Sequence, residues 1–464
     1  MARGAALVAV RRTLTWEPVA VYHELLSTGD LAERSAEVLR DGQRDRRLVF
    51  GDHPLCVALR PQLLSRERYE GAMAASRHIH GALHALERAL LEDDALRGEL
   101  DLDPEEERLA LAPTPCRASS PSARIDGFLT DRLRYVEYNA ESPAGMAYSD
   151  TLAEVFERLP VMRAFRKRYR LRTLPVARRQ LSTMLRCFRE WGRAQTPVAA
   201  IVDWKDLPTV AEFEMFRDRF ERQGIPTVIC SPQELEYRGP RKGLYAKGKR
   251  VNLIYRRVLT TELLAKGGEA AALKEAYLDG AACVVNTFRA KLLHKKMSLA
   301  LLSDDRYSAI YTPAQRQAIA AHVPWTRKVR EGATRKGNRK VADLAAYVAA
   351  GRTHLVLKPN DEYGGKGVVL GWTVGQAEWE EALRVALTQS YVVQEAVPVP
   401  REPFPVALGD GASEILDLAM DMDPYLFEGR PSGCLTRLSS SALLNVTAGE
   451  GSVVPTYVVE GSGP

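Results

Sequence analysis

The stretch His354–Gly371 decides the fold of this chain, and it reads H-L-V-L-K-P-N-D-E-Y-G-G-K-G-V-V-L-G. An apolar strand carries one lysine, Lys358, and a proline ends the strand before the flexible turn Gly364-Gly365-Lys366-Gly367. A cation on a rigid strand and a glycine turn with open backbone N–H groups can hold the phosphates of a nucleotide triphosphate without a Walker loop. A lysine in an apolar strand is costly to bury without an anion. We therefore expect a phosphate beside Lys358, with a protein carboxylate as the alternative partner.

A second polar stretch lies more than two hundred residues earlier. It contains Arg124-Ile-Asp126, and then Y-V-E-Y-N-A-E-S-P-A-G with Glu137 and Asn139 two residues apart. Alternation along a strand puts Glu137 and Asn139 on one face, and Asp126 is expected on the paired strand. These are the hard oxygen ligands that Mg²⁺ prefers when it bridges a protein to phosphate. Arg124 shares the face and could contact a γ-phosphate; a surface hairpin with polar alternation is the alternative.

A further strand, Tyr391–Val397, follows the glycine turn by about thirty residues. Gln394 and Glu395 lie at its end, where backbone and side-chain groups can bind the edge of an adenine. Val393 and Val397 would supply apolar walls. The stretch therefore predicts the adenine side of a nucleotide site.

Composition sets the broad class of the protein. The chain has 464 residues, 65 Lys and Arg against 59 Asp and Glu, and a net charge of +6. That small excess of positive charge suits an enzyme that binds polyanionic ligands. It is smaller than the positive charge typical of a nucleic-acid-binding protein. No apolar run is long enough to span a membrane. The apolar piece Ala5–Val10 is too short for a signal peptide, and the six scattered cysteines predict reduced thiols in a cytoplasmic protein.

The pattern predicts an α/β (α+β) chain in three parts. Residues 1–115 form a helical region, with helices over Val21–Leu39 and Tyr69–Leu91. Residues 116–290 carry the metal-ligand stretch and a Rossmann-like βαβ unit, with strands at Pro197–Val202, Pro226–Cys230 and Val251–Tyr255, and hence a parallel sheet. Residues 291–464 carry the glycine turn.

Three other features have competing interpretations. His80 and His84 have zinc-binding spacing on a helix, but a solvated helix face is the better interpretation. The basic stretch Thr326–Lys340 is either a solvated loop or a lid that attracts an anionic ligand. Asp417, Asp421 and Asp423 form a rival metal set, which we rank below Glu137 and Asn139.

Taken together, the motifs resemble the circularly permuted ATP-grasp proteins related to glutathionylspermidine synthetase. The resemblance is carried by R-x-D, E-Y-N-A-E-S-P-A-G, F-R-A-K-L-L-H-K-K and L-K-P-N-D-x-Y-G-G-K-G-V, and it covers roughly residues 120–464. It implies a circularly permuted ATP-grasp fold with a pre-ATP-grasp-like βαβ unit. It also implies an ATP- and Mg²⁺-dependent ligase that joins a carboxylate to an amine through an acyl phosphate and releases ADP and phosphate.

The resemblance also implies roles for individual residues. Asp126, Glu137 and Asn139 match Mg²⁺ ligands, and Arg124 and Arg437 match arginines close to the reacting phosphate. Ser142 borders the region of the substrate. The nucleotide-binding positions are Lys296, Lys358, Tyr363, Gly364, Gly365, Lys366, Gly367, Gln394, Glu395 and Val397.

The departures from the family limit what the resemblance implies. An N-terminal cysteine amidase domain is missing, and residues 1–120 match no pattern, so the family's substrates are not carried over. The partners expected are a small-molecule or peptide carboxylate and an amine, with no nucleic acid and no membrane. A non-catalytic ATP-binding scaffold is the first alternative. The second is a nucleic-acid binder that uses Arg163–Arg172 and Thr326–Lys340.

Overall fold

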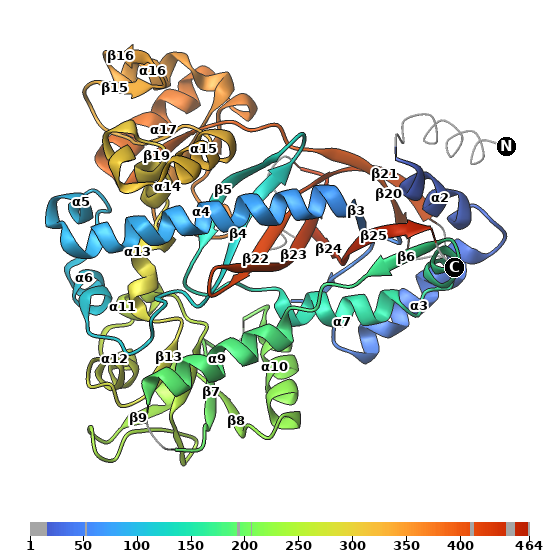
Figure 1. Cartoon of the computed structure of the whole chain (residues 1–464), viewed down its shortest axis with the longest axis horizontal. Helices are drawn as coiled ribbons and strands as arrows, with labels where there is room; N and C mark the ends of the chain where they lie inside the picture. The colour runs from blue at the N-terminus through green and yellow to red at the C-terminus, as the bar shows by residue number, and fades with distance from the viewer. Residues whose placement is uncertain are drawn as a thin grey trace.

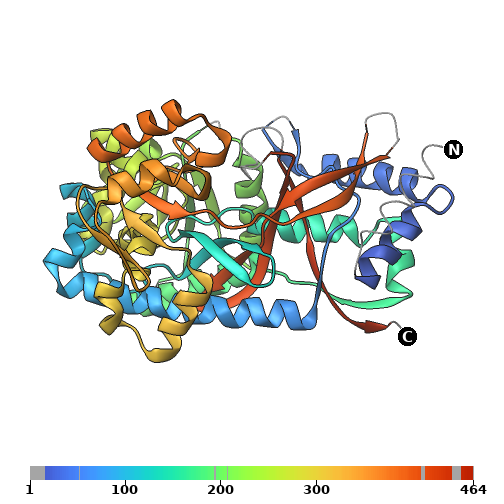
Figure 2. The ribbon, with the colours of Figure 1, turned by 90° about the horizontal axis from the view of Figure 1, so that it is seen from above.

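The computed structural model describes residues 16–51, 53–192, 195–205, 207–408, 413–441 and 451–462, and these form a mixed α+β protein. A central antiparallel sheet lies between two lobes (Figure 1). We call residues 326–395 the hairpin lobe and residues 199–285 the parallel lobe. Seen from above, both lobes lie at one end of an elongated molecule, and helices α2 (Glu17–Leu26) and α3 (Leu31–Asp45) lie at the other (Figure 2).

The central sheet joins strands from distant parts of the sequence. Strand β22 (Asp423–Phe427) pairs antiparallel with β4 (Ser122–Leu129), about three hundred residues earlier in the chain. The long helix α4 (Arg66–Glu92) crosses this sheet (Figure 1); Ser65 caps its N-terminus, and its apolar residues recur at helical spacing. The strand order is β20 (Arg401–Ala407), β21 (Ser413–Met420), β23 (Arg430–Ser439), β22 (Asp423–Phe427), β4 (Ser122–Leu129) and β5 (Leu133–Asn139), with β24 (Gly451–Val454) on β23.

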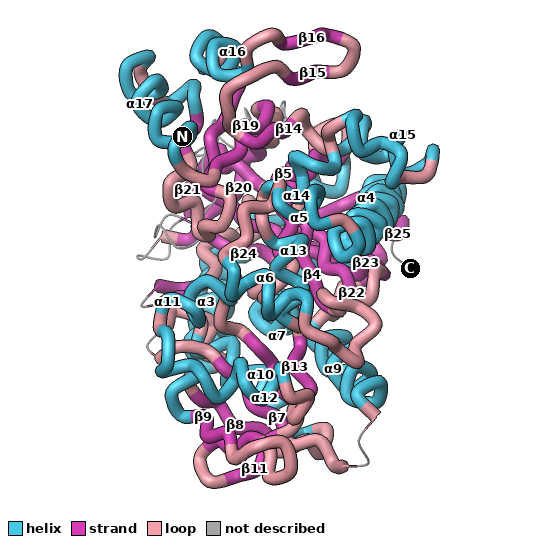
Figure 3. The backbone as a smooth tube through the Cα atoms, turned by 90° about the vertical axis from the view of Figure 1, so that its left-hand side faces the viewer, coloured by secondary structure: helices cyan, strands magenta, loops and turns pink. Residues whose placement is uncertain are grey.

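The hairpin lobe is a four-stranded sheet covered by two helices. The fully buried Trp379 fills its core and donates from its indole to the carbonyl of Val348. The sheet order is β14 (Thr326–Lys328), β19 (Tyr391–Glu395), β17 (Leu355–Pro359) and β18 (Val369–Leu370). The other elements are α16 (Leu344–Ala350), α17 (Gln376–Thr388) and the projecting hairpin of β15 (Thr334–Lys336) and β16 (Arg339–Val341) (Figure 3). Helices α13 (Lys291–His294), α14 (Met297–Leu302) and α15 (Pro313–His322) precede the lobe.

The parallel lobe confirms the predicted βαβ unit as a parallel sheet. Its order is β13 (Cys283–Val285), β12 (Leu253–Arg256), β7 (Ala199–Val202) and β8 (Thr227–Cys230), and neighbouring strands in it are parallel. Strands β7 and β12 are buried throughout, as expected for the middle of a parallel sheet. Around it lie α9 (Ala177–Trp191), α10 (Val210–Arg222), α11 (Thr260–Ala265), α12 (Ala271–Leu278), β9 (Leu235–Tyr237), β10 (Leu244–Ala246) and β11 (Lys249–Val251).

The remaining elements belong neither to the central sheet nor to the two lobes. They are α5 (Asp94–Gly98), α6 (Pro104–Leu111), α7 (Met146–Phe156), α8 (Pro160–Arg166), the short pair β1 (Val49–Phe50) and β2 (His53–Pro54), and a sheet of β3 (Gln62–Ser65), β25 (Thr456–Ser462) and β6 (Tyr169–Arg172). Among the described residues, every helix is too short or too polar to cross a bilayer.

Two sequence predictions about local structure are wrong. The helix predicted over Val21–Leu39 is broken between α2 and α3, where Gly29 takes a left-handed φ of 55° and the Ser27 hydroxyl bonds back to the Glu24 carbonyl. Most of the basic stretch Thr326–Lys340 is β-structure and not a loop, because β14 pairs with β19 and β15 pairs with β16. The N-terminal piece Ala5–Val10 lies outside the described residues.

The histidine and cysteine predictions have different outcomes. The prediction of a solvated helix face is wrong for His80, which is half-buried, with Nδ1 3.1 Å from the Tyr138 hydroxyl. His84 is exposed, and no zinc-binding cluster forms among the described residues. All six cysteines are buried and free, as predicted.

Candidate active site

A cavity of about 470 Å³ opens between the central sheet, the hairpin lobe and the parallel lobe. It gathers most of the site residues named from the sequence, although these are spread over more than three hundred positions. Lys366 and Gly367 are not among its lining residues; Lys366 is exposed and pairs with Glu362. The lining includes Arg124, Asp126, Glu137, Asn139, Ser142, Lys296, Lys358, Tyr363, Gly364, Gly365, Gln394, Glu395, Val397 and Arg437.

The hairpin of β4 and β5 has the predicted register. Arg124 lies opposite Asn139, and Asp126 lies opposite Glu137, so all four side chains belong to one face of the sheet. The Asn139 side-chain amide donates to Asp126 Oδ1 at 2.9 Å. The alternation read from the sequence is therefore confirmed as geometry.

Asp126 is held by two arginines. Arg124 donates to both of its carboxylate oxygens, at 2.7 and 2.9 Å, and Arg437 Nη2 donates to Oδ2 at 2.9 Å. Burial alone would raise the pKa of Asp126, but the charges of Arg124 and Arg437 outweigh it and lower the pKa to about 2. Asp126 is thus ionised at neutral pH, with both oxygens already engaged.

The rival metal set divides between two places. Asp421 and Asp423 join the same cluster, because Arg437 Nε lies 2.6 Å from Asp421 Oδ2 and Nη2 lies 3.0 Å from Asp423 Oδ2. Asp417 is exposed and pairs with Arg401. The cluster therefore holds three carboxylates and two guanidinium groups. Burial raises the pKa of Asp423 well above its usual range, the Arg437 charge opposes that shift, and the Asp126 and Asp421 charges add to it.

The donor set fits Mg²⁺ only in part. Among the described residues no three His, Cys, Asp or Glu side chains are placed to hold a metal ion by themselves. Asp126 and Glu137 nevertheless offer two neighbouring carboxylates, and Asn139 offers an amide oxygen. This set suits a magnesium ion that arrives with phosphate oxygens, and does not form a complete metal site of its own.

Two lysines line the cavity from different elements, Lys296 just before α14 and Lys358 on β17. Lys296 Nζ lies 3.0 Å from Glu137 Oε1 and donates to the Glu362 carbonyl at 2.6 Å. Lys358 donates to the Val136 carbonyl at 3.2 Å and to Gln394 Oε1 at 2.7 Å, and it forms no ion pair with a described residue. Burial lowers the pKa of Lys358 to about 8, against the opposing effect of the Glu137 carboxylate. The carboxylate partner that was the alternative for Lys358 is not found in the part of the chain that the structure describes.

The glycine turn lies over these lysines and is fixed at its base. Asp361, just before the turn, accepts from Lys291 Nζ at 2.6 Å, and the Tyr363 hydroxyl reaches Glu262 Oε1 at 2.9 Å. Gly364 and Gly365 have φ values of 65° and 76°, which a residue with a side chain rarely adopts. The sequence of the turn thus specifies a backbone shape that approaches the cavity closely.

The strand predicted to bind adenine is more engaged than expected. The Gln394 amide joins Lys358 to Thr326 Oγ1, and the Glu395 carboxylate lies 2.7 Å from Lys336 Nζ. Val397 lines the cavity, but Val393 is fully buried inside the hairpin lobe, so the prediction for Val393 is wrong. Val356 and Val399 provide the additional apolar wall.

The far end of the cavity carries polar residues that the sequence reasoning missed. Arg257 is buried and donates to the Pro143 carbonyl at 2.8 Å, while its Nε has no partner among the described groups. The buried Tyr148 hydroxyl is also without a partner there. Burial raises the pKa of Asp203 to about 6. The sequence signal that could have revealed these polar residues was the pair Arg256-Arg257 at the end of an apolar strand.

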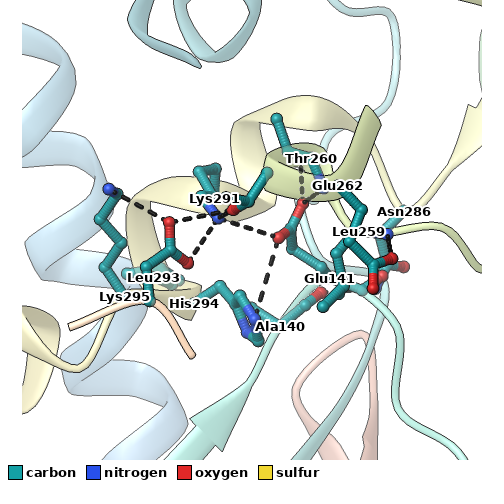
Figure 4. A network of polar contacts seen from close by, with 12 residues as sticks. Ala140, Glu141, Leu259, Thr260, Glu262, Asn286, Lys291, Leu293, His294 and Lys295 are labelled. Carbon is teal, nitrogen blue, oxygen red and sulfur yellow. Dashed lines mark hydrogen bonds and ion pairs between the residues drawn. The ribbon is translucent and has the colours of Figure 1, made fainter. Parts of the chain in front are cut away.

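A buried ionic network lies next to the cavity (Figure 4). Glu141, in the turn after β5, lies 2.9 Å from Arg256 Nη1 and 3.4 Å from Lys291 Nζ, and accepts from the Thr260 hydroxyl. His294 lines the cavity and lies 3.8 Å from Glu141 Oε2. Since Arg256, Lys291 and Glu141 are all fully buried, the network fixes the relative positions of β5, β12 and α13.

Comparisons with known proteins give a fold and no family. No family model matches the chain, and no curated protein matches it. A glutathione synthetase-like effector from Globodera pallida, solved in its apo form, is similar over 92% of this chain and 97% of its own, with a TM-score of 0.57 and 14% identity. A protein described as a gamma-glutamylcysteine synthetase from Methylobacillus flagellatus covers 85% of this chain and 89% of its own, with a TM-score of 0.39 and 11% identity. The first similarity shows that the two chains share a fold.

Proposed function

We propose that the protein is an ATP-dependent carboxylate–amine ligase with a circularly permuted ATP-grasp fold. The observation that carries the proposal is Lys358, a buried cation that lines the cavity together with the glycine turn and forms no ion pair with a described residue. A second cation, Lys296, and the facing Asp126–Glu137 pair lie around the same space. A triphosphate with a bound divalent cation would complement both the free positive charge and the carboxylates.

In the proposed reaction, a carboxylate oxygen of the acid substrate attacks the γ-phosphorus of ATP, and ADP leaves with the electrons of the broken P–O bond. The amine then attacks the carbonyl carbon of the acyl phosphate, and phosphate and a proton are released. Lys296 and Lys358 would hold the phosphate oxygens in line and neutralise them. Loss of one such contact typically lowers the rate roughly a hundredfold.

Asp126, Glu137 and Asn139 would hold the magnesium ion, which supplies charge neutralisation on the phosphates when it is bound. Arg124 and Arg437 orient Asp126 from two sides. Both guanidinium groups are paired with carboxylates, so we assign them the role of positioning the Asp126 carboxylate. The glycine turn and its Tyr363–Glu262 contact would exclude water, because acyl phosphates hydrolyse.

The substrate side of the proposal rests on the far end of the cavity. Ser142, Tyr148, Asp203 and Arg257 all line the cavity, and we assign them to the substrate. The unpartnered Tyr148 hydroxyl and Arg257 Nε are buried groups that a polar substrate would satisfy. They support a small polar acid or peptide at this end.

Thermal stability with and without Mg²⁺-ATP tests the proposal. We expect nucleotide to raise the Tm of the wild type, and Lys358→Ala and Glu137→Ala to remove most of the increase. Asp417→Ala, in an exposed ion pair, is the matched control and should behave as wild type. Loss of the metal-dependent increase only in Asp417→Ala and Asp421→Ala would contradict the assignment of Asp126, Glu137 and Asn139.

A non-catalytic ATP-binding protein is the second candidate. It is favoured by the engagement of Asp126 with two arginines, which leaves no preformed metal site among the described residues. ADP release with panels of acids and amines distinguishes the two. Nucleotide-dependent stabilisation without ADP release from any pair would favour the binding protein, and turnover that needs both an acid and an amine would favour the ligase.

A further inference from the structure

A second cavity, of about 300 Å³, lies behind the β15–β16 hairpin and shares no lining residue with the candidate active site. We call it the hairpin cavity. Its apolar floor comes from Met297, Ala300 and Leu301 of α14 and from Leu344 of α16. Figure 3 shows the hairpin projecting beside α16. A volume of this size suits a small molecule and is too small for a folded partner.

The walls of the hairpin cavity carry an excess of positive charge. Six lysines and arginines line it against three acidic residues. Lys328 and Arg330 are paired with Asp101 and Glu99. The remaining cations on the walls are Arg306, which pairs with Asp304, and Arg327, Arg335 and Lys340.

Arg335 and Lys340 lie directly opposite each other on the hairpin. Both are exposed, and neither forms an ion pair with a described residue. Glu331, the third acidic residue of the lining, is exposed and on the preceding turn. Two adjacent cations without counter-ions repel each other, and an anion between them would relieve that repulsion.

Arg327 adds a buried charge beneath them. It is 4% exposed, and its guanidinium donates to Thr334 Oγ1, to the Ser303 carbonyl and to the Arg335 carbonyl. These neutral acceptors satisfy its hydrogen bonds. Its ion pair with Asp304 is long, at 4.0 Å, and Asp304 also takes two bonds from Arg306. Burial of a charge whose counter-ion is distant and shared is costly, which favours an anion nearby.

We propose that the hairpin cavity binds a small organic anion, whose carboxylate or phosphate lies between Arg335 and Lys340 above Arg327 and whose apolar part rests on the α14 floor. The proposal does not depend on the ligase reaction. It also gives a role to the basic stretch Thr326–Lys340, whose charges the candidate active site uses only at Lys336, through Glu395.

Isothermal titration of the full chain with two probes, phenyl phosphate and benzoate, tests the proposal. Inorganic phosphate tests charge alone, and benzyl alcohol tests the apolar part alone. The double variant Arg335→Ala/Lys340→Ala removes the two exposed cations. Arg339→Ala is the matched control, because it removes an exposed cation from the same hairpin that does not line the cavity. Lys358→Ala reports binding at the candidate active site instead.

We expect at least one organic probe to bind, and to bind roughly tenfold more weakly to the double variant at low salt, since each exposed cation contributes modestly. Arg339→Ala and Lys358→Ala should bind as wild type. The probe that binds more tightly shows whether the cavity prefers a carboxylate or a phosphate. Three results would overturn the proposal: neither probe binds, binding is lost in Lys358→Ala and kept in the double variant, or inorganic phosphate binds as tightly as the organic probes.

Discussion

Lys358 is the residue on which the chemistry of the cavity depends. Its ammonium group donates to a carbonyl and to an amide oxygen, and burial lowers its pKa to about 8. The protonated form therefore dominates at pH 7 and is progressively lost above pH 8. The positive charge that attracts phosphate is thus present under neutral conditions and absent in mild alkali.

The affinity for Mg²⁺-ATP should fall as pH rises from 7 to 9.5. Loss of one charge-assisted hydrogen bond costs about 1.5–3 kcal/mol, which is roughly a ten- to hundredfold change. Titration calorimetry at several pH values measures it. Lys358→Arg keeps its charge over this range and should show a flat profile. A wild-type affinity that stays constant to pH 9.5 would show that Lys358 is not the phosphate cation.

At the scale of elements, the glycine turn is defined by its backbone. Gly367 has a φ of 70°, and a Cβ added there would lie 2.7 Å from Pro359 Cγ. The side chain of Lys366, one residue earlier, is 76% exposed. The turn therefore tolerates change at position 366 and not at position 367.

Gly367→Ala should displace the turn and weaken nucleotide binding. The left-handed φ alone costs about 1–2 kcal/mol, and the clash with Pro359 adds to it. Lys366→Ala is the control and should bind nucleotide within about threefold of wild type, since an exposed ion pair contributes at most about 1 kcal/mol. Equal nucleotide affinity for Gly367→Ala and wild type, measured by calorimetry, would show that the turn does not cover the ligand.

For the whole molecule, the Glu141 network is the junction between lobes. Glu141 belongs to the turn after the central sheet, Arg256 to the parallel lobe and Lys291 to α13, while Asp361 in the hairpin lobe also binds Lys291. Burial would raise the pKa of Glu141, but Lys291 and Arg256 outweigh it and hold the pKa well below its usual range. The stability that Glu141 contributes is therefore present above about pH 4.5 and is lost as pH falls below that value.

Glu141→Gln should lower the free energy of unfolding at pH 7 by about 3–5 kcal/mol, because the buried Arg256 loses its carboxylate and Lys291 loses one of its ion-pair partners. The variant should also lose less stability than wild type when pH falls from 5 to 3. Urea denaturation at both pH values measures this. Glu154→Gln, in an exposed and weakly paired position, is the control. A change below about 1 kcal/mol would mean that the lobes are held together mainly by apolar contacts.

The sequence by itself determined the features that depend on local period and turn chemistry. The alternation in β5 placed Glu137 and Asn139 on one face, and the register with β4 brought Arg124 and Asp126 there. The apolar strand predicted the position of Lys358, and the glycine turn predicted the backbone segment that lines the cavity with it. Such features are readable because residues two apart on a strand share a face in any fold.

Only the tertiary structure decided which distant groups meet. Arg437 neutralises Asp126 together with Asp421 and Asp423 because β22 pairs with β23 and with β4. The far end of the cavity and the Glu141 network join residues more than one hundred positions apart. The counter-ion of a buried charge is set by packing between lobes, and no local pattern in the chain records that packing.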